Sequence, residues 1–63
     1  MHAMTFRIGN VVETVPEYAE AGFVEKYIRG TVIELDEFLN SVKLVTFDGR
    51  TGWINEDWIK TVI

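Results

Sequence analysis

The stretch GTVIELDEFLNSVKLVTFDGRTGWI, residues 30–54, decides the fold. After Gly30 the chain alternates between two sets of positions: Thr31, Ile33 and Leu35 in one, and Val32, Glu34 and Asp36 in the other. An alternation with a period of two is typical of a strand that is buried on one face. The sequence therefore predicts a half-buried strand over residues 30–36.

The second part of this stretch predicts a hairpin. SVKLVTF, residues 41–47, is rich in residues that favour strands, and Asp48-Gly49 follows it directly. An Asp-Gly pair between two β-prone runs is a strong hairpin signal, because glycine takes the positive φ that such turns require. We therefore expect strands over residues 41–47 and 51–55.

The flanking segments predict two more strands. Residues 7–15 (RIGNVVETV) are a strand candidate that ends at Pro16, because proline cannot donate to a strand ladder. Residues 16–30 are read as a long excursion. Asn55 is followed by two acidic residues, which predicts a capped single turn of 3₁₀ type and then a last strand over residues 59–62.

Five short strands in a chain of 63 residues predict one all-β domain spanning residues 1–63. An open sheet of this size would have two exposed edges, so a small closed barrel is expected. The chain contains no cysteine, and 48% of its residues are hydrophobic. Packing, or a partner, must therefore stabilise the fold without disulfides.

The charge is acidic, with ten Asp and Glu against six Lys and Arg. An acidic domain repels a phosphate backbone at long range, so nucleic acid is not the expected partner and a basic protein surface is. No stretch has the length and hydropathy of a signal peptide or a membrane span. A cytoplasmic location without membrane contact is the corresponding expectation.

Residues for catalysis or metal binding are sparse. The one histidine is His2, so no nucleophile has an obvious neighbouring base. The adjacent carboxylates at residues 36–37 and 56–57 lack the glycine-spaced loop of a calcium site. We therefore expect no enzyme activity, no metal and no cofactor.

The C-terminal half resembles the Src-homology-3 (SH3) domain. GRTGWINEDWI, residues 49–59, is similar to the family segment G-x-x-G-x-I/F-P-S-N-Y-V, and Ile33 and Leu35 follow Gly30 at the family's two core positions. The resemblance covers residues 30–63. It implies a five-stranded SH3-like barrel with a short 3₁₀ turn near the C-terminus.

The chain departs from this family at the positions that bind proline-rich peptides. Asn55 occupies the place of the family's proline, Trp58 that of its tyrosine, and residues 41–43 that of its Trp-Trp pair. Two walls of the peptide groove are thus missing, so we do not expect the usual binding of proline-rich peptides. Trp58 remains a candidate for ligand contact at the groove edge.

The expected function is a non-catalytic protein–protein interaction module, either monomeric or weakly homo-oligomeric. Its partner is a protein or peptide that is basic at the contact, because exposed rings and carboxylates both bind cations. The candidate binding residues are aromatic or polar (Tyr18, Tyr27, Trp53, Asn55, Trp58) and acidic (Glu20, Glu25, Asp36, Glu37). We expect Phe6, Phe23 and Phe47 to pack in the core or at an edge.

Two alternatives stay open. The first is a small-barrel nucleic-acid module that uses Arg29, Lys43, Arg50 and Lys60 beside an aromatic platform. The second is an accessory subunit whose apolar patches are covered by a larger complex.

Overall fold

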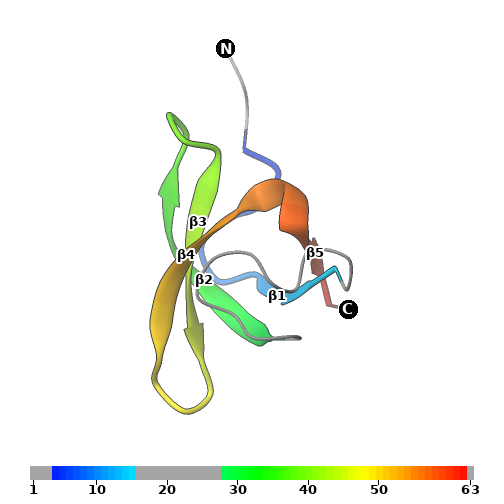
Figure 1. Cartoon of the computed structure of the whole chain (residues 1–63), viewed down its shortest axis with the longest axis vertical. Helices are drawn as coiled ribbons and strands as arrows, with labels where there is room; N and C mark the ends of the chain where they lie inside the picture. The colour runs from blue at the N-terminus through cyan, green and yellow to red at the C-terminus, as the bar shows by residue number, and fades with distance from the viewer. Residues whose placement is uncertain (1–3, 16–27, 63) are drawn as a thin grey trace.

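The structure, a computed structural model, describes residues 4–15 and 28–62. These residues form five strands and one 3₁₀ turn: β1 (Val11–Thr14), β2 (Arg29–Asp36), β3 (Ser41–Thr46), β4 (Thr51–Asn55), η2 (Glu56–Trp58) and β5 (Ile59–Thr61). All strand pairs are antiparallel (Figure 1). The predicted all-β class and the turn before the last strand are confirmed.

The first strand is shorter than predicted, because the chain turns before it. Gly9 has a φ of +100°, and its N–H donates to the carbonyl of Val32 at 2.8 Å. The N–H of Asn10 donates to the carbonyl of Arg7 at 3.0 Å, and the Asn10 side chain accepts from the Arg7 N–H at 2.9 Å. The chain can therefore join the regular ladder only from Val11.

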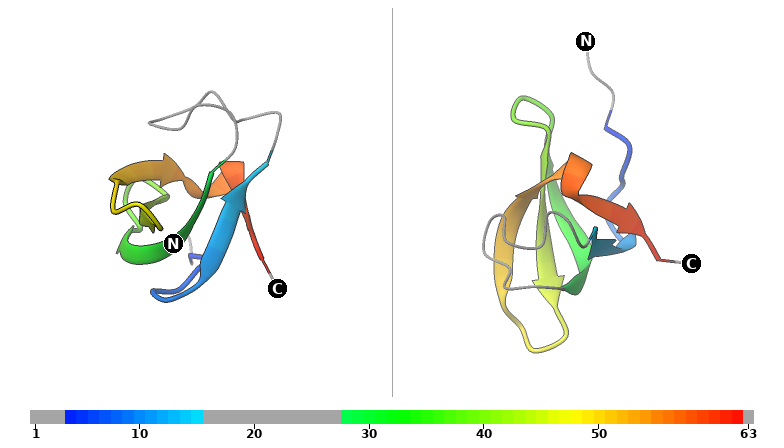
Figure 2. Two further views of the ribbon diagram at one scale, coloured as in Figure 1. Left: turned by 90° about the horizontal axis from the view of Figure 1, so that it is seen from below. Right: turned by 45° about the vertical axis from the view of Figure 1, so that its right-hand side comes forward.

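The strands form one sheet in the order β4-β3-β2-β1-β5. The two outermost strands, β4 and β5, are consecutive in sequence and are joined by η2. Figure 2 shows that the sheet curves strongly, so that its two ends approach each other at this turn. The pairing itself is that of an open sheet, and closure into the expected barrel is not shown.

The core lies inside this curve. Its buried apolar side chains are Phe6, Val12, Ile28, Val32, Val42, Leu44, Ile54 and Ile59. Met4, Leu35 and Trp58 pack against them while keeping some exposure. All five strands thus contribute buried side chains to the core, and Phe6 covers it from the N-terminal segment, as expected.

One predicted core position on β2 is wrong. Val32 is fully buried, whereas Ile33 is only half-buried. The register explains this, since Val32 lies opposite Leu44 but Glu34 lies opposite Lys43, so the two strands slip by one residue at a β-bulge. A bulge places an extra residue in one strand, and the inward positions become Val32 and Leu35 instead of Ile33 and Leu35.

The hairpin between β3 and β4 is confirmed at the predicted pair. Gly49 has a φ of +89°, in the region that favours glycine. Its N–H donates to the carbonyl of Thr46 at 2.9 Å, and the Thr46 N–H donates to the carbonyl of Arg50 at 2.9 Å. Thr46 thereby closes the ladder just before the turn.

Candidate functional site

The β2–β3 hairpin has one exposed aromatic side chain near its turn, Phe38, and another at its opposite end, Phe47. β2 ends at Asp36, and residues 37–40 turn the chain into β3, which ends at Thr46 (Figure 1). Phe38 in this turn is 93% exposed, and Phe47 after β3 is fully exposed. The six residues of β3 separate these side chains by roughly 20 Å at the usual rise of a strand. The two rings therefore belong to different surfaces.

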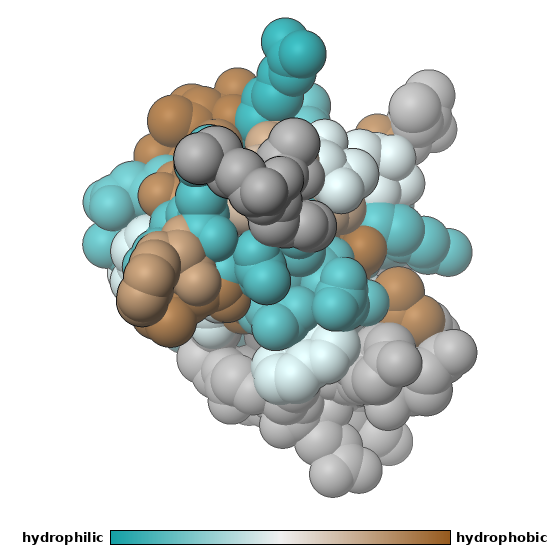
Figure 3. Space-filling model, turned by 90° about the horizontal axis from the view of Figure 1, so that it is seen from above, coloured by the Kyte–Doolittle hydropathy of each residue, from teal (hydrophilic) through white to brown (hydrophobic). Residues whose placement is uncertain are grey.

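We call Asp36, Glu37, Phe38, Leu39 and Asp57 the acidic tip. Leu39 is 61% exposed beside Phe38. Its N–H donates to Asp36 Oδ1 at 3.2 Å, so a carboxylate of the tip also holds the turn. Figure 3 views the molecule from this end and shows apolar side chains in brown beside hydrophilic ones in teal.

A backbone hydrogen bond brings η2 to the same end. The N–H of Glu56 donates to the carbonyl of Asn40 at 2.9 Å, which places Asp57 next to the β2–β3 turn. Asn40 itself has a φ of +53°, a conformation that asparagine tolerates better than most residues. The β2–β3 turn is therefore held in place by the Asp36 carboxylate and by its hydrogen bond with η2.

The carboxylates of the tip are not neutralised within the described residues. None of the ion pairs in residues 4–15 and 28–62 involves Asp36, Glu37 or Asp57. Carboxylates that lie around exposed apolar side chains give the tip a negative potential, which favours a cationic partner.

The outer face of the sheet adjoins the tip and carries Trp53. Ile54 is buried, and Trp53 beside it on β4 is 43% exposed, because neighbours on a strand point to opposite faces. Trp53 lies opposite Lys43, whose Nζ is 3.6 Å from Glu34 Oε2 on β2. In the row nearer the tip, Ser41 lies between Asp36 and Asn55. Trp53, Asn55 and Asp36 thus lie on one face of the sheet, and Glu37 follows Asp36 in the turn.

Asn55 and Trp58 have structural roles that the sequence only partly indicated. Asn55 Oδ1 accepts from the Asp57 N–H at 2.8 Å, which confirms the predicted cap of η2. The φ of Asn55 is −66°, close to the value that a proline ring imposes. Trp58 packs partly against the core, and its carbonyl accepts from the Val15 N–H at 2.7 Å.

Four of the predicted site residues lie outside the described part of the chain: Tyr18, Glu20, Glu25 and Tyr27. The role of these four as binding residues stays a prediction. Phe23 also lies outside the described part, so its predicted packing stays a prediction as well.

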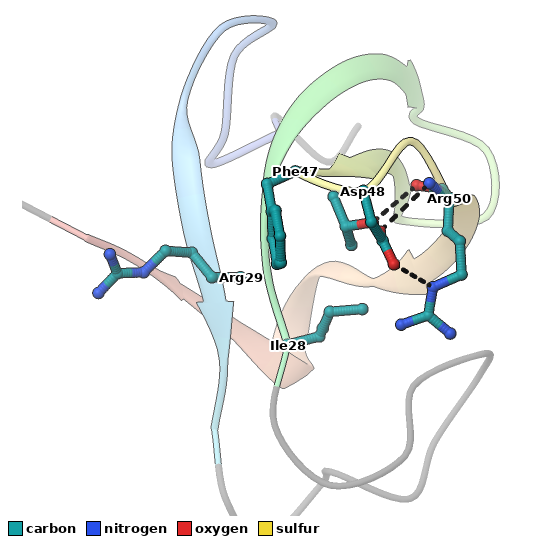
Figure 4. A pocket seen from close by; sticks show the side chains of 6 residues that line it. Ile28, Arg29, Phe47, Asp48 and Arg50 are labelled. Atoms are coloured by element: carbon teal, nitrogen blue, oxygen red, sulfur yellow. Dashed lines mark hydrogen bonds and ion pairs between the residues drawn. The ribbon is translucent and has the colours of Figure 1, made fainter.

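The second surface is the Phe47 end, which we define as Phe47, Ile28, Arg29, Asp48 and Arg50. Phe47 is exposed instead of packed, because β3 ends at Thr46 and the chain turns at once. One hollow of about 260 Å³ is lined by these residues and Thr46. A second hollow of about 250 Å³ lies along Val45, Thr46, Phe47 and the start of β2. Figure 4 shows the ring of Phe47 standing between the side chains of Arg29 and Asp48.

Asp48 is held as a carboxylate at this end. The Thr46 hydroxyl donates to Asp48 Oδ1, and Arg50 Nε is 3.2 Å from Asp48 Oδ2. The hydrogen bond from Thr46 contributes most to keeping the pKa of the Asp48 carboxyl below its usual range, and Arg50 acts in the same direction.

We expect Thr46→Val to raise the pKa of Asp48 toward its ordinary value, because the variant keeps the shape of the side chain and removes the donor. A carboxyl whose pKa is lowered by folding stabilises the folded state above its unfolded pKa and loses this contribution as pH falls through the folded pKa. Thr46→Val should therefore weaken the dependence of stability on pH in the acid range below about pH 4. The measurement is a carbon-detected NMR titration of the Asp48 side chain.

Arg50→Gln is the matched control for this titration. It keeps the Thr46 hydroxyl and removes the nearby positive charge, so it should raise the Asp48 pKa by less than Thr46→Val does. An unchanged Asp48 pKa in Thr46→Val would contradict the assignment.

Sequence reasoning missed Phe38, Leu39 and Phe47 as surface residues. The available signal was their position, since all three lie in or beside short connections between strands, and such connections run over the surface. Within the described residues, no group of three or more His, Cys, Asp or Glu is placed to hold a metal ion. None of the described segments forms a helix with the length and hydropathy needed to cross a bilayer.

No protein-family model, curated protein or solved structure matches this chain.

Proposed function

We propose that this chain is a non-catalytic interaction module that binds a protein or peptide with a basic contact region through the acidic tip. The observation that carries the proposal is the exposure of Phe38 and Leu39 between carboxylates that have no ion-pair partner in the described residues. Exposing two large apolar side chains at one turn to water is unfavourable, and a partner that covers them would remove this cost.

The chemistry of the tip suits a partner that combines apolar and cationic side chains. Phe38 and Leu39 offer apolar area, and the ring of Phe38 also attracts a cation over its face. Asp36, Glu37 and Asp57 can accept hydrogen bonds from Arg or Lys around that centre. An apolar centre with a polar rim is the usual anatomy of a protein interface. Trp53 on the adjoining sheet face can extend the contact.

The described cations do not favour the nucleic-acid alternative. All four that the sequence offered for this role lie 3.2 to 3.7 Å from a carboxylate: Arg29, Lys43, Arg50 and Lys60. Binding a phosphate backbone would require these cations to leave their acidic partners within a domain whose net charge is already negative.

We propose an SH3-like architecture for the domain. Five antiparallel strands with a 3₁₀ turn before the last one are compatible with that fold. The proposed surface, however, lies at the β2–β3 turn and not at a groove for proline-rich peptides, since residues 41–43 lack the family's tryptophans. Fold and binding mode are separate proposals here.

The test is a titration of isotope-labelled protein with a peptide of alternating Arg and Leu, followed by amide and indole NMR shifts. A peptide with Glu in place of Arg is the charge control. We expect saturable shifts at residues 36–41 and at the Trp53 indole with the basic peptide alone, and weaker binding at high salt. Equal shifts with both peptides, or no saturation up to about 1 mM peptide, would overturn the proposal (at 1 mM the binding free energy is only about −4 kcal/mol).

Matched variants locate the binding site. Phe38→Ser should weaken binding by roughly 30-fold, which corresponds to a hot-spot loss of about 2 kcal/mol. Phe47→Ser removes an equally exposed ring at the opposite end and should leave peptide affinity unchanged. The opposite pattern would place the site at the Phe47 end and contradict the proposal.

A further inference from the structure

One edge of β4 carries backbone groups that no described strand pairs with. β4 forms a margin of the sheet, with β3 on one side and none of the described strands on the other (Figure 2). The Thr46 N–H donates to the carbonyl of Arg50 at 2.9 Å, and hydrogen-bonded and non-hydrogen-bonded pairs alternate from there along an antiparallel ladder. Thr51 and Trp53 fall on the non-hydrogen-bonded pairs, so their N–H and C=O groups point away from β3. We call this side of β4, formed by the backbone of Thr51 and Trp53, the free edge.

The free edge lacks the features that usually keep a sheet from pairing with another chain. Proteins commonly protect edge strands by short length, by charged residues, especially lysine, and by proline. β5, at the other margin of the sheet, has three residues and carries Lys60. β4 has five residues, TGWIN, with no charge and no proline. The N–H and C=O groups of the free edge are therefore a template for one more strand.

The surroundings of the free edge favour a strand with cations at alternate positions. β4 ends at Asn55, and Asp57 of the acidic tip follows two residues later. Trp53 is 43% exposed on the outer face of the sheet, and an indole ring attracts a cation over its face. Every second side chain of a strand lies on the same face. Cations at alternate positions of an added strand would thus meet the Trp53 ring and, beyond Asn55, the carboxylates of the tip.

We propose that the basic partner binds as an extended strand on the free edge, antiparallel to β4, with its N-terminal end toward the acidic tip. Its cationic side chains lie on the outer face beside Trp53. Residues directly opposite each other in an antiparallel pair share a face, so the amides of these same cationic residues bond to Thr51 and Trp53. This inference rests on the proposed function and adds the mode of binding, which is strand addition to a sheet edge.

The test uses the Arg/Leu peptide of the proposed function in three forms: unmodified, N-methylated at every Arg amide, and N-methylated at every Leu amide. The amides of Arg point to one edge of the extended peptide and those of Leu to the other. Methylation at Arg should weaken binding at least about tenfold, because the donors that face β4 are lost, and methylation at Leu at most about twofold. The two methylated peptides have the same charge and side chains, so each controls for the other.

Amide hydrogen exchange measures the same contact on the protein. The bound peptide should protect the amides of Thr51 and Trp53. The amides of Gly52 and Ile54 already face β3, so their exchange should stay unchanged. Trp53→Thr keeps a residue that favours strands and removes the ring. This variant should weaken peptide binding roughly two- to fivefold and still show protection of the Thr51 amide in the complex.

The outcomes separate this inference from the proposed function. If the unmodified peptide binds but both methylated peptides bind equally, or the Thr51 and Trp53 amides stay unprotected, strand pairing is wrong and the tip remains a binding surface. A larger loss on Leu methylation would place Leu beside Trp53 and would also overturn the inference. Protection of both amides in the free protein would mean that the edge is already occupied, which contradicts it as well. If the unmodified peptide does not bind, both proposals fail.

Discussion

Leu44→Ala is expected to cost about 2–5 kcal/mol of folding free energy, which is the usual range for removing a fully buried leucine side chain. Leu44 has no exposed surface and lies on β3 at the centre of the core. A domain of 63 residues is stable by only roughly 3–9 kcal/mol in total. The substitution should therefore remove about half of the total stability, and the urea midpoint should fall in proportion. Urea unfolding followed by circular dichroism measures this loss.

Two variants on the same strand test whether burial is the cause. Val45→Ala truncates the next residue, which is half-buried on the outer face, and should cost much less than Leu44→Ala. Leu44→Met keeps the volume of the side chain and should cost less than about 1.5 kcal/mol. If Leu44→Ala and Val45→Ala were equally stable, the described arrangement of faces on β3 would be wrong.

Gly30→Ala is the second substitution with a large expected effect. A Cβ atom on Gly30 would lie 2.8 Å from the carbonyl oxygen of Val45 and 3.3 Å from Leu44 Cβ. The oxygen belongs to the backbone of β3, directly across the ladder, so it cannot move without disturbing strand pairing. Overpacking of this kind costs about 1–3 kcal/mol of folding free energy, and the midpoint temperature of thermal unfolding should fall by about 4–8 °C for each kcal/mol.

Gly49 is the control, because a side chain is disfavoured there for a different reason. No described atom lies within 4 Å of its ideal Cβ, but its φ of +89° is rarely adopted by L-residues. Gly49→Asn should therefore be tolerated better than Gly49→Ala, since asparagine accepts positive φ more readily. At Gly30, asparagine should be worse than alanine. A Gly30→Ala variant with unaltered stability would contradict the close approach of β2 and β3.

The features that the sequence predicted well are local ones. The Asp48-Gly49 hairpin and the Asn55 cap depend on residues within four positions of each other, and both have the expected geometry. The alternation after Gly30 correctly predicted a strand. It could not reveal the bulge beside Ile33, because a bulge is defined by the partner strand and has no counterpart in the alternation.

The exposed residues and the closure of the sheet were harder to predict, because both depend on contacts between segments that are distant in sequence. Phe47 reads as a core residue from its hydrophobicity, and only the end of β3 at Thr46 leaves it exposed. Phe38 and Leu39 lie in a connection whose carboxylates were recognised, but their convergence with Asp57 depends on the contact between Asn40 and Glu56. Closure depends on curvature across the whole sheet, which no short pattern specifies.

The strand order also has a kinetic consequence. The two ladders β2–β3 and β3–β4 require closure of only residues 37–40 and 47–50, whereas β1–β5 brings Val12 against Thr61. Loop-closure entropy opposes pairing between distant segments, and folding slows as sequence separation grows. We therefore expect the meander of β2, β3 and β4 to form first, because its pairings have the smallest loop-closure entropy to overcome. We therefore expect the pairing of β1 with β5 to be the last and slowest step of folding.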